Sequence, residues 1–511
     1  MANKKEINYA IKTCLPENRL ELDYWDEIDC QVLERFREKG LNREDLLAIQ
    51  KKLPIIYPWN DYNYQNYRTN YNRNINYFPT AIILCRSSLD VQKSLHFVKK
   101  YNFVFSVRSG GHCTLGYSLT TGIVIDLSLM DEIIVEQTKE SIANADEIHC
   151  DRHVILGPGA SLGVVIEQLS EYDISLPVGS CINTCVGGLT LGGGISPSLI
   201  RSSGLSIDHL IRAEIVLPNE KIIQVDKKNY SDLFFALRGA GGGNFGIVTK
   251  FIFNPVRYLG ATVFKLQYPI TEFSNVIDRW QRFFPFTDTR CSAELNLSSP
   301  KFNKYPIEIQ GQFEGSEKEL KTLLRNFISL AKSSKGTVFI DFISKFSDVG
   351  RFWGSTQQAY FNENSIFWYN FLSEDAIKIM LKYLENAPVP EARISFNAML
   401  GKVAETSSSA TAFPWRKALF WNHIVSNTQE PLLVPDQLSW VNKLYDDLLP
   451  YVKKIKNTIP AYVNMVQANL TLHRRYMRSY YGENRHRLIQ IKTKYDPHNL
   501  FKFQQSIPLA K

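Results

Sequence analysis

Apolar positions at the start of the chain follow a helical period. Between residues 18 and 52, apolar side chains such as Trp25 and Val32 recur at helical spacing among charged ones, which predicts a helical arm. Pro54 ends this region. The Tyr- and Asn-rich stretch that follows, residues 55–75, predicts an irregular segment.

From Thr80 to Pro255 short apolar runs alternate with helical patterns. Strands are predicted at 81–85, 104–108, 122–127, 153–159, twice within 210–225 and at 247–253, and helices at 88–100 and 161–169. After Pro255, strand-like runs such as 262–268 alternate with amphipathic helical stretches such as 316–333. This second pattern is typical of a separate α+β domain with an antiparallel sheet.

Length and charge narrow the class of protein. A chain of 511 residues exceeds what one hydrophobic core supports, so two or three domains are expected. The net charge of +8 comes from basic residues interleaved with 51 acids, and this dispersal predicts no nucleic-acid partner.

The distribution of apolar residues also bears on location. The first residues lack an apolar signal region, and no stretch is long and apolar enough to span a bilayer. We therefore expect a soluble protein with no membrane partner. It would be cytoplasmic or exported by a route that needs no signal peptide.

Cysteine spacing argues against a metal site. The eight cysteines form no CxxC pair. Cys181 and Cys185 lie four residues apart, but no second Cys or His pair matches them at a zinc-binding spacing. No metal is therefore expected.

One glycine cluster resembles a dinucleotide-binding motif. Residues 241–246, Gly-Gly-Gly-Asn-Phe-Gly, fit the pattern GxGxxG, which requires a strand before it and a helix after it. Residues 247–253 are apolar at alternate positions and predict a strand instead. A Rossmann site is thereby excluded, although the glycine backbone can still wrap a phosphate group.

Two nucleophilic side chains lie in glycine-rich runs. His112 ends the run Arg108-Ser109-Gly110-Gly111-His112, and Cys181 opens a run that reaches Gly194. Backbone without side chains can approach a flat ligand closely, so a His and a Cys placed in this way can tether one cofactor at two points. Taken singly, each has a plainer interpretation: a turn histidine and a small buried cysteine.

Five motifs, in one order, carry a resemblance to a known family. They are residues 108–112, 181–194, 238–249, 480–484, and 494–501 with 505–508. In these motifs the chain resembles the berberine bridge enzyme-like FAD-linked oxidases, within the vanillyl-alcohol oxidase or PCMH-type FAD-binding fold. The resemblance covers residue 53 to the C-terminus.

The resemblance implies a two-domain α+β fold. Residues 53–255 would form the FAD-binding domain, and residues 256–467 the substrate domain with its antiparallel sheet. Residues 468–511, the berberine bridge enzyme-like segment, would return to complete the FAD domain, which makes that domain discontinuous. Residues 1–52 would be an additional helical arm.

The resemblance also implies how FAD is held. The family's motif histidine, which corresponds to His112, bonds the flavin 8α-methyl group, and its motif cysteine, which corresponds to Cys181, bonds flavin C6. Both side chains are nucleophiles suited to an electron-poor ring. The other cofactor contacts expected from the motifs are Arg108, Ser109, Gly110, Gly111, Gly187, Gly188, Gly246, Ile247, Val248 and Asn499.

The implied reaction is oxidation of a small molecule. A C–OH group of a sugar, an oligosaccharide or a secondary-metabolite alcohol would give a hydride to flavin N5, and O2 would reoxidise the flavin and form hydrogen peroxide. Two alternatives stay open: a dehydrogenase with a non-oxygen electron acceptor, and a catalytically silent flavin-binding protein. The motifs specify neither the substrate nor the oligomeric state.

The catalytic base is where the chain departs from the family. Many members carry Tyr-x-Asn-Tyr, whereas this chain has Met465 at the second Tyr position, and Met465 accepts no proton. Glu405, eight residues before Phe413, and Tyr462 are the two candidates for the base. Thr184, three residues after Cys181, resembles in shape the valine that accompanies oxidase behaviour in the family.

Overall fold

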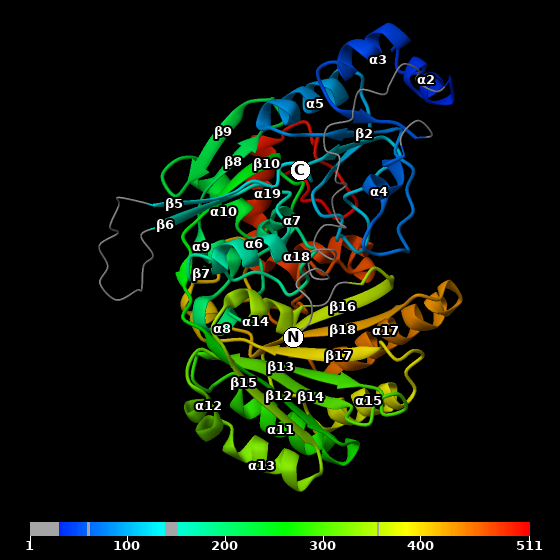
Figure 1. The fold of residues 1–511 in the computed structure, drawn as a ribbon. Helices are drawn as coiled ribbons and strands as arrows, with labels where there is room; N and C mark the ends of the chain where they lie inside the picture. The colour runs from blue at the N-terminus through cyan, green and yellow to red at the C-terminus, as the bar shows by residue number, and fades with distance from the viewer. Residues whose placement is uncertain (1–29, 59–61, 138–151, 355–356, 511) are drawn as a thin grey trace.

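A seven-stranded antiparallel sheet forms the wide layer in the lower half of the molecule (Figure 1). The computed structural model describes residues 30–58, 62–137, 152–354 and 357–510. The strand order is β15-β12-β14-β13-β17-β18-β16. The bounds are β12 Ala261–Tyr268, β13 Cys291–Ser298, β14 Ile307–Phe313, β15 Thr337–Ile343, β16 Tyr360–Trp368, β17 Arg393–Ala398 and β18 Phe420–Thr428.

The two faces of this sheet have opposite characters. Along each strand, alternate side chains point to opposite faces. On β13, Leu295 and Leu297 belong to a buried core, whereas Glu294, Asn296 and Ser298 line a cavity on the other face. The same alternation runs through β14, β17 and β18.

Five helices cover the apolar face, whereas α14 Phe346–Trp353 contacts the opposite face, where Gln310 donates to the Phe352 carbonyl oxygen. The buried cluster on that face takes side chains from α11 Phe273–Phe283, α12 Glu317–Leu323, α13 Arg325–Ser333, α15 Glu374–Glu385 and α17 Val434–Leu448. The stretch 316–333, predicted to be helical, forms two helices, α12 and α13. Each of them packs its buried side chains on the sheet. The rest of the polar face is left for the other half of the molecule.

The upper half contains two smaller sheets. One has the order β1-β2-β4-β3, with parallel pairing of β2 to β4 and of β4 to β3, and the other is antiparallel with the order β5-β6-β10-β8-β9. The bounds are β1 Ile55–Ile56, β2 Ala81–Leu84, β3 Phe105–Arg108, β4 Ile123–Asp126, β5 Ile133–Gln137, β6 Arg152–Leu156, β8 Leu210–Val216, β9 Ile222–Asp226 and β10 Ile247–Phe253. A short pair, β7 Ile174–Ser175 with β11 Val256–Arg257, lies apart from both.

Helices of the upper half pack around these sheets. Their bounds are α5 Ser88–Lys100, α6 Leu162–Ser170, α7 Val186–Leu191, α8 Ile200–Ser203, α9 Ser206–His209 and α10 Ser231–Leu237. The strand that rules out a Rossmann site is present as β10. The predicted helix 88–100 is α5, and Ser87 caps its N-terminus by accepting the Asp90 N–H.

The N-terminal arm is not one continuous helix. It contains α2 Cys30–Arg37 and α3 Arg43–Gln50, and the part of the prediction before residue 30 lies outside the described residues. Gly40 lies between the helices with φ +77, and a capping box of Asn42 and Asp45 starts α3. The segment expected to be irregular holds β1 and a short helix, α4 Tyr64–Arg68.

The end of the chain packs into the upper half. Helix α19 Arg485–Tyr495, drawn in red, lies beside β10 of that half, and α18 Arg475–Tyr481, drawn in orange, lies below it near the middle of the molecule (Figure 1). Their side chains Tyr481 and Leu488 belong to the same buried cluster as Phe251 of β10. Segments far apart in the sequence therefore share one core.

Asn72 joins the two halves directly. Its side-chain amide donates to the carbonyl oxygens of Thr114 (2.8 Å) and Phe361 (3.0 Å), and its Oδ1 accepts the Phe361 N–H (2.9 Å). Phe361 belongs to β16 of the large sheet, and Thr114 follows the His112 loop. Asn72 is 3% exposed, so these bonds are shielded from water.

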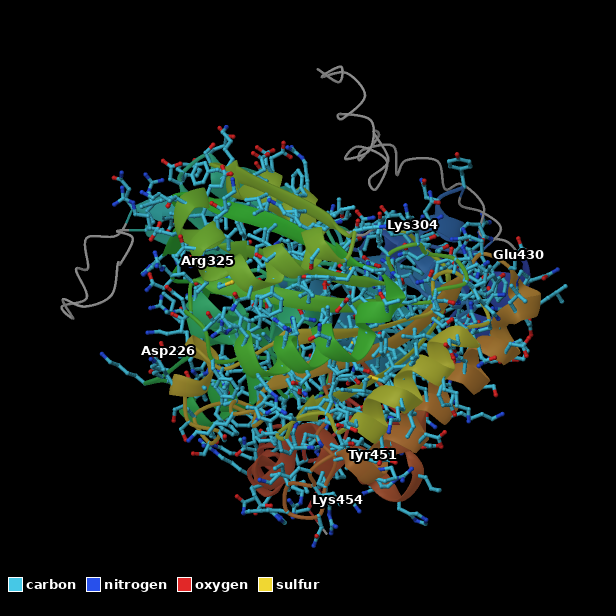
Figure 2. All side chains as sticks on the ribbon, turned by 90° about the horizontal axis from the view of Figure 1, so that it is seen from below. Asp226, Lys304, Arg325, Glu430, Tyr451 and Lys454 are labelled. Atoms are coloured by element: carbon cyan, nitrogen blue, oxygen red, sulfur yellow. The ribbon has the colours of Figure 1, made fainter. Side chains whose placement is uncertain are left out.

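Exposed charges are spread around the surface. Lys304, Arg325, Glu430 and Lys454, all exposed, stand on different sides of the molecule in Figure 2. Within the described residues, no helix combines the length and the apolar run that crossing a bilayer requires.

A buried ion pair holds the C-terminal segment in place. Lys492 and Asp496 both have fully buried side chains, and their Nζ–Oδ2 distance is 2.6 Å. Lys492 Nζ also donates to the carbonyl oxygens of Asn244 and Phe501, each at 2.7 Å. One ammonium group thereby links α19, the 241–246 glycine loop and the segment after α19.

Replacing Lys492 by Met should lower the free energy of unfolding by about 3–5 kcal/mol, because Asp496 would stay buried without its partner. Lys494→Met is the matched control, since the Lys494–Asp232 pair is 61% and 32% exposed and such pairs contribute about 0–1 kcal/mol. Urea unfolding monitored by tryptophan fluorescence measures both. Equal losses in the two variants would show that Lys492 is no anchor.

Candidate active site

A cavity of about 910 Å³ separates the glycine loops of the upper half from the polar face of the large sheet. This volume is at the upper end of the range for small-molecule sites, about 300–1,000 Å³. Most of the residues predicted from the sequence line it: Ser109, Gly110, Gly111, His112, Cys181, Thr184, Gly187, Gly188, Gly246, Ile247, Val248 and Tyr462. Loops distant in the sequence thus meet at one place.

His112 is presented by the loop that follows β3. Its Nδ1 contacts the Gly110 carbonyl oxygen at 2.9 Å, and because a carbonyl only accepts, Nδ1 carries the proton. Nε2 is buried and has no hydrogen-bond partner among the described residues. Burial lowers the pKa of His112 to about 4, so the imidazole is neutral and keeps a free lone pair.

Tyr71 fixes the plane of the His112 ring. The two rings are stacked, with centroids 4.5 Å apart and an interplanar angle of 19°. The Tyr71 N–H donates to the Gly111 carbonyl oxygen (2.9 Å), which holds the two segments together. No local pattern predicts this contact, because Tyr71 lies in a stretch that predicts irregular structure.

Cys181 opens the second glycine-rich loop. Burial raises the pKa of its thiol, and the charge of Arg393 partly offsets that effect. Glu363 and Glu294 also act on the thiol, in the direction of a higher pKa. Cys181 therefore faces residues of the large sheet across the cavity.

Glycine is required where the two loops meet. A Cβ atom on Gly110 would lie 2.8 Å from the Cys185 backbone nitrogen and 2.9 Å from its Sγ, closer than real contacts allow. A Cβ atom on Gly188 would meet nothing within 4 Å, because this position faces the open cavity. One glycine serves packing of the loops, and the other leaves bare backbone toward a ligand.

Two predicted cofactor contacts lie outside the cavity lining. Arg108 forms an ion pair with Asp126 (2.7 Å) and donates to the Thr69 carbonyl oxygen (3.2 Å), so it supports the His112 loop from behind. Asn499 has φ +52 in a turn, where its N–H donates to the Asp496 carbonyl oxygen (2.9 Å). Each also has one buried side-chain atom, Arg108 Nε and Asn499 Oδ1, without a hydrogen-bond partner among the described residues, so the predicted cofactor contacts stay predictions.

Glu405 is corrected from a candidate base to a surface residue. It ends the short helix α16 Lys402–Glu405, its side chain is 64% exposed, and it forms an ion pair with Lys402 (3.1 Å). It does not line the cavity. Its distance along the sequence from Phe413 did not translate into a place beside the cofactor, because the 401–412 loop runs outward between them.

Tyr462 lies inside the cavity wall and binds the glycine loop. Its hydroxyl oxygen accepts the N–H groups of Gly194 (3.2 Å) and Ile195 (3.3 Å) and the Asn464 amide (3.1 Å). Burial raises the pKa of Tyr462 in spite of these three donors, so the phenol is neutral near pH 7. A neutral phenol is a weak base, and this one is already used in positioning the loop.

A series of rings crosses the cavity wall from His112 to Tyr462. After the His112–Tyr71 stack come Tyr71–Phe361 (5.8 Å), Phe361–His423 (6.5 Å), His423–Trp421 (5.8 Å) and Trp421–Tyr462 (5.7 Å), measured between centroids. We call these six residues the aromatic arc. It places one titratable imidazole, His423, in the cavity that the nucleophile His112 also lines.

The polar face of the sheet contributes residues that the sequence reasoning missed. Glu363, His423, Arg393 and Glu294 all line the cavity, and burial raises the pKa of Glu294. A usable signal was present in the sequence. Polar residues recur at every second position within strands that are otherwise apolar, and such positions share one face.

Two family models match the chain. A model described as FAD binding domain matches residues 79–226, and one described as berberine and berberine like matches residues 461–508. A FAD-linked oxidoreductase of Bacillus subtilis, YgaK, whose function is uncharacterised, is 33% identical over 88% of this chain and 95% of its own length.

Solved structures share the fold. Physcomitrella patens BBE-like 1 superimposes with a TM-score of 0.80 at 22% identity, over 91% of this chain and 99% of the other. A chitooligosaccharide oxidase gives 0.77 at 22% identity, over 91% and 98%. These similarities confirm the α+β fold with its FAD-binding part and large antiparallel sheet. With the Bacillus relative they show that the chain belongs to the berberine bridge enzyme-like family of FAD-linked oxidoreductases.

Proposed function

We propose that this enzyme is an oxidase with FAD attached to both His112 and Cys181, and that it oxidises a C–OH group of a carbohydrate or a related alcohol. The observation that carries the proposal is the single cavity that unites both nucleophiles, the glycine loops and a polar sheet face. The alternatives, a dehydrogenase and a silent flavoprotein, are outcomes of the tests below.

The residues present fit a flat, covalently held cofactor. His112 offers a neutral ring with an unpartnered nitrogen, and Cys181 lines the same cavity. Gly188 leaves open space where a side chain would otherwise project. Thiol and imidazole are the side chains that form stable bonds to an electron-poor ring.

When bound, FAD supplies the hydride-accepting chemistry, and O2 returns it to the oxidised state. The residues of the chain orient the substrate and exclude water. Tyr462 holds the loop at Gly194 and Ile195 in a fixed position beside the reacting group. The aromatic arc gives that side of the cavity an apolar wall of stacked and edge-on rings.

The polar sheet face supports a polyhydroxylated substrate. Asn296, Gln310, Asn397 and Asn427 present amides at the cavity, and each amide both donates and accepts. The Asn397 Oδ1 atom is buried without a partner among the described residues. The chitooligosaccharide oxidase that shares this fold is named for a sugar substrate, which agrees with this class.

The attachment is tested by the visible spectrum and peptide mass of the purified protein. Flavin should survive acid precipitation, and one flavin should join the peptides that contain His112 and Cys181. His112→Ala and Cys181→Ala should each retain flavin through a single bond, and the double variant should release all of it. Flavin released from the unchanged protein would refute the covalent part of the proposal.

Gly188→Ala tests whether the cofactor lies on the bare backbone. Because a Cβ atom here meets no protein atom, and alanine in a helix is favoured over glycine by about 0.5–1 kcal/mol, the unfolding midpoint should not fall. The flavin-to-protein absorbance ratio should drop, since the methyl group occupies cofactor space. An unchanged ratio would place the cofactor elsewhere in the cavity.

Thr184→Leu separates oxidase from dehydrogenase behaviour. Thr184 lines the cavity next to the Cys181 loop, and a larger side chain there should slow reoxidation by air roughly tenfold or more. Stopped-flow absorbance should show anaerobic reduction by substrate unchanged. If the unaltered protein already reoxidises slowly, the dehydrogenase alternative replaces the oxidase.

A panel of glucose, cellobiose, diacetylchitobiose and benzyl alcohol tests the substrate class. Bleaching of the flavin absorbance under anaerobic conditions, and hydrogen peroxide formation in air, are the expected results with the sugars. Tightly bound flavin that no panel member reduces would favour the silent flavoprotein.

A further inference from the structure

We infer that His423, held by Glu363, is the base that takes the hydroxyl proton of the substrate. This inference rests on the proposed function. His423 is the catalytic residue because it faces the cavity, and Glu363 is a positioning residue that acts through it.

The hydrogen bond between the two side chains fixes the imidazole tautomer. His423 Nε2 lies 2.8 Å from Glu363 Oε2, and because a carboxylate only accepts, Nε2 carries the proton. The lone pair of the neutral ring is therefore on Nδ1, which has no hydrogen-bond partner among the described residues. A base with an available lone pair thus faces the cavity.

The strands hold this pair in register. β16 and β18 are antiparallel neighbours, with Ser365 opposite His423 and Glu363 opposite Val425. Glu363 is consequently the diagonal neighbour of His423 on the same face. Placement on two adjacent strands of a seven-stranded sheet gives the pair a rigid support.

Ring stacking fixes the plane of the imidazole. The Trp421 ring is stacked on the His423 ring with an interplanar angle of 10°. The Phe361 ring is tilted by 34° relative to the His423 ring. The side chains of His423 and Glu363 are 10% and 3% exposed. The carboxylate therefore lies beside the ring in a place with little water, where its charge acts strongly on the imidazole.

Charged side chains of three neighbouring strands line the cavity together with His423. Glu363 is on β16, Arg393 on β17 and Glu294 on β13, and the hydroxyl of Tyr462 comes from the loop before α18. Two carboxylates and one guanidinium thus surround the ring, and Glu363 is the group in hydrogen-bond contact with it.

The positions that the sequence suggested for the base are excluded by position or chemistry. Glu405 is exposed and outside the cavity, and Met465 accepts no proton. The Tyr462 oxygen already accepts three N–H groups and keeps its own proton near pH 7. His423 is the cavity residue that combines a free lone pair with a supporting carboxylate.

Two bonds of a secondary alcohol break in this step. The O–H bond breaks and its proton moves to His423 Nδ1, and the C–H bond breaks with its electron pair, which FAD held at His112 and Cys181 would accept as a hydride. A C=O bond forms, so the substrate is oxidised by two electrons and FAD is reduced by two. The resulting imidazolium is stabilised by the Glu363 carboxylate.

The test compares three variants of the flavin-loaded protein: His423→Gln, Glu363→Gln and the control His96→Gln. His96 forms a similar pair with Glu220 (3.0 Å) on the surface, where its side chain is 63% exposed. All three should retain flavin in the amount found in the unaltered protein, and dithionite should reduce all of them at the unaltered rate.

The rate of anaerobic flavin reduction by cellobiose or diacetylchitobiose is the first readout. His423→Gln should lower it by about 10²–10⁴-fold, the usual contribution of a general base, and His96→Gln should leave it unchanged. A His423→Gln protein that is reduced as fast as the unaltered one would overturn the inference.

The titration of His423 is the second readout and needs no turnover. In ¹³C-labelled histidine spectra of the flavin-loaded protein, the His423 signal is the one absent from His423→Gln. Glu363→Gln should lower its titration midpoint by about one pH unit or more, because the carboxylate no longer stabilises the imidazolium. An unchanged midpoint would refute the role of Glu363.

The two readouts separate this inference from the proposed function. If no sugar reduces the unaltered protein, the substrate class is wrong while the titration still reports on the pair. If sugars reduce the protein and His423→Gln has no effect, the proposed function holds and the base is another group.

Discussion

One buried ammonium group, that of Lys492, sets the position of the cofactor side of the cavity. It has three acceptors, and each belongs to a different part of the polypeptide: Asp496 in the turn after α19, Asn244 in the glycine loop and Phe501 near the C-terminus. A charge without water must be paired and fully hydrogen-bonded. The glycine loop, which carries few side chains of its own to pack, is therefore fixed through its backbone.

The opposite wall of the cavity is the polar face of the large sheet. It depends on the alternation of side chains along the strands rather than on a single contact. Because side chains alternate along a strand, six of the seven strands supply both the apolar core beneath the sheet and the polar wall above it. A register shift of one residue in β13 would bury Glu294 and expose Leu295 to the cavity. The hydrophobic core therefore specifies where the polar residues of the site face.

Local sequence patterns predicted most of the elements correctly. Helix α5 and strands β2, β3, β4 and β10 follow from apolar periodicity and caps that neighbouring residues provide. The glycine-rich loops around His112 and Cys181 are predictable for the same reason, because the residues that define each loop are consecutive in the sequence. These features depend on short segments only.

The rest of the site depends on contacts between distant segments. Glu405 was placed by its distance along the chain from Phe413, and the outward course of the loop made that distance irrelevant. His423 and Glu363 are 60 residues apart, and only the pairing of β18 with β16 brings them together. Tyr71 stacks on His112 from a stretch with no recognisable periodicity.

The bonds of Asn72 have a consequence for the order in which the protein matures. They join segments 289 residues apart, between an early part of the chain and β16. Contacts of such long sequence separation form late, because the loop between them must close first. The cavity thus acquires its walls only after nearly the whole polypeptide has been synthesised. The attachment of FAD proposed at His112 would then be a late step of biogenesis, because it needs the folded cavity.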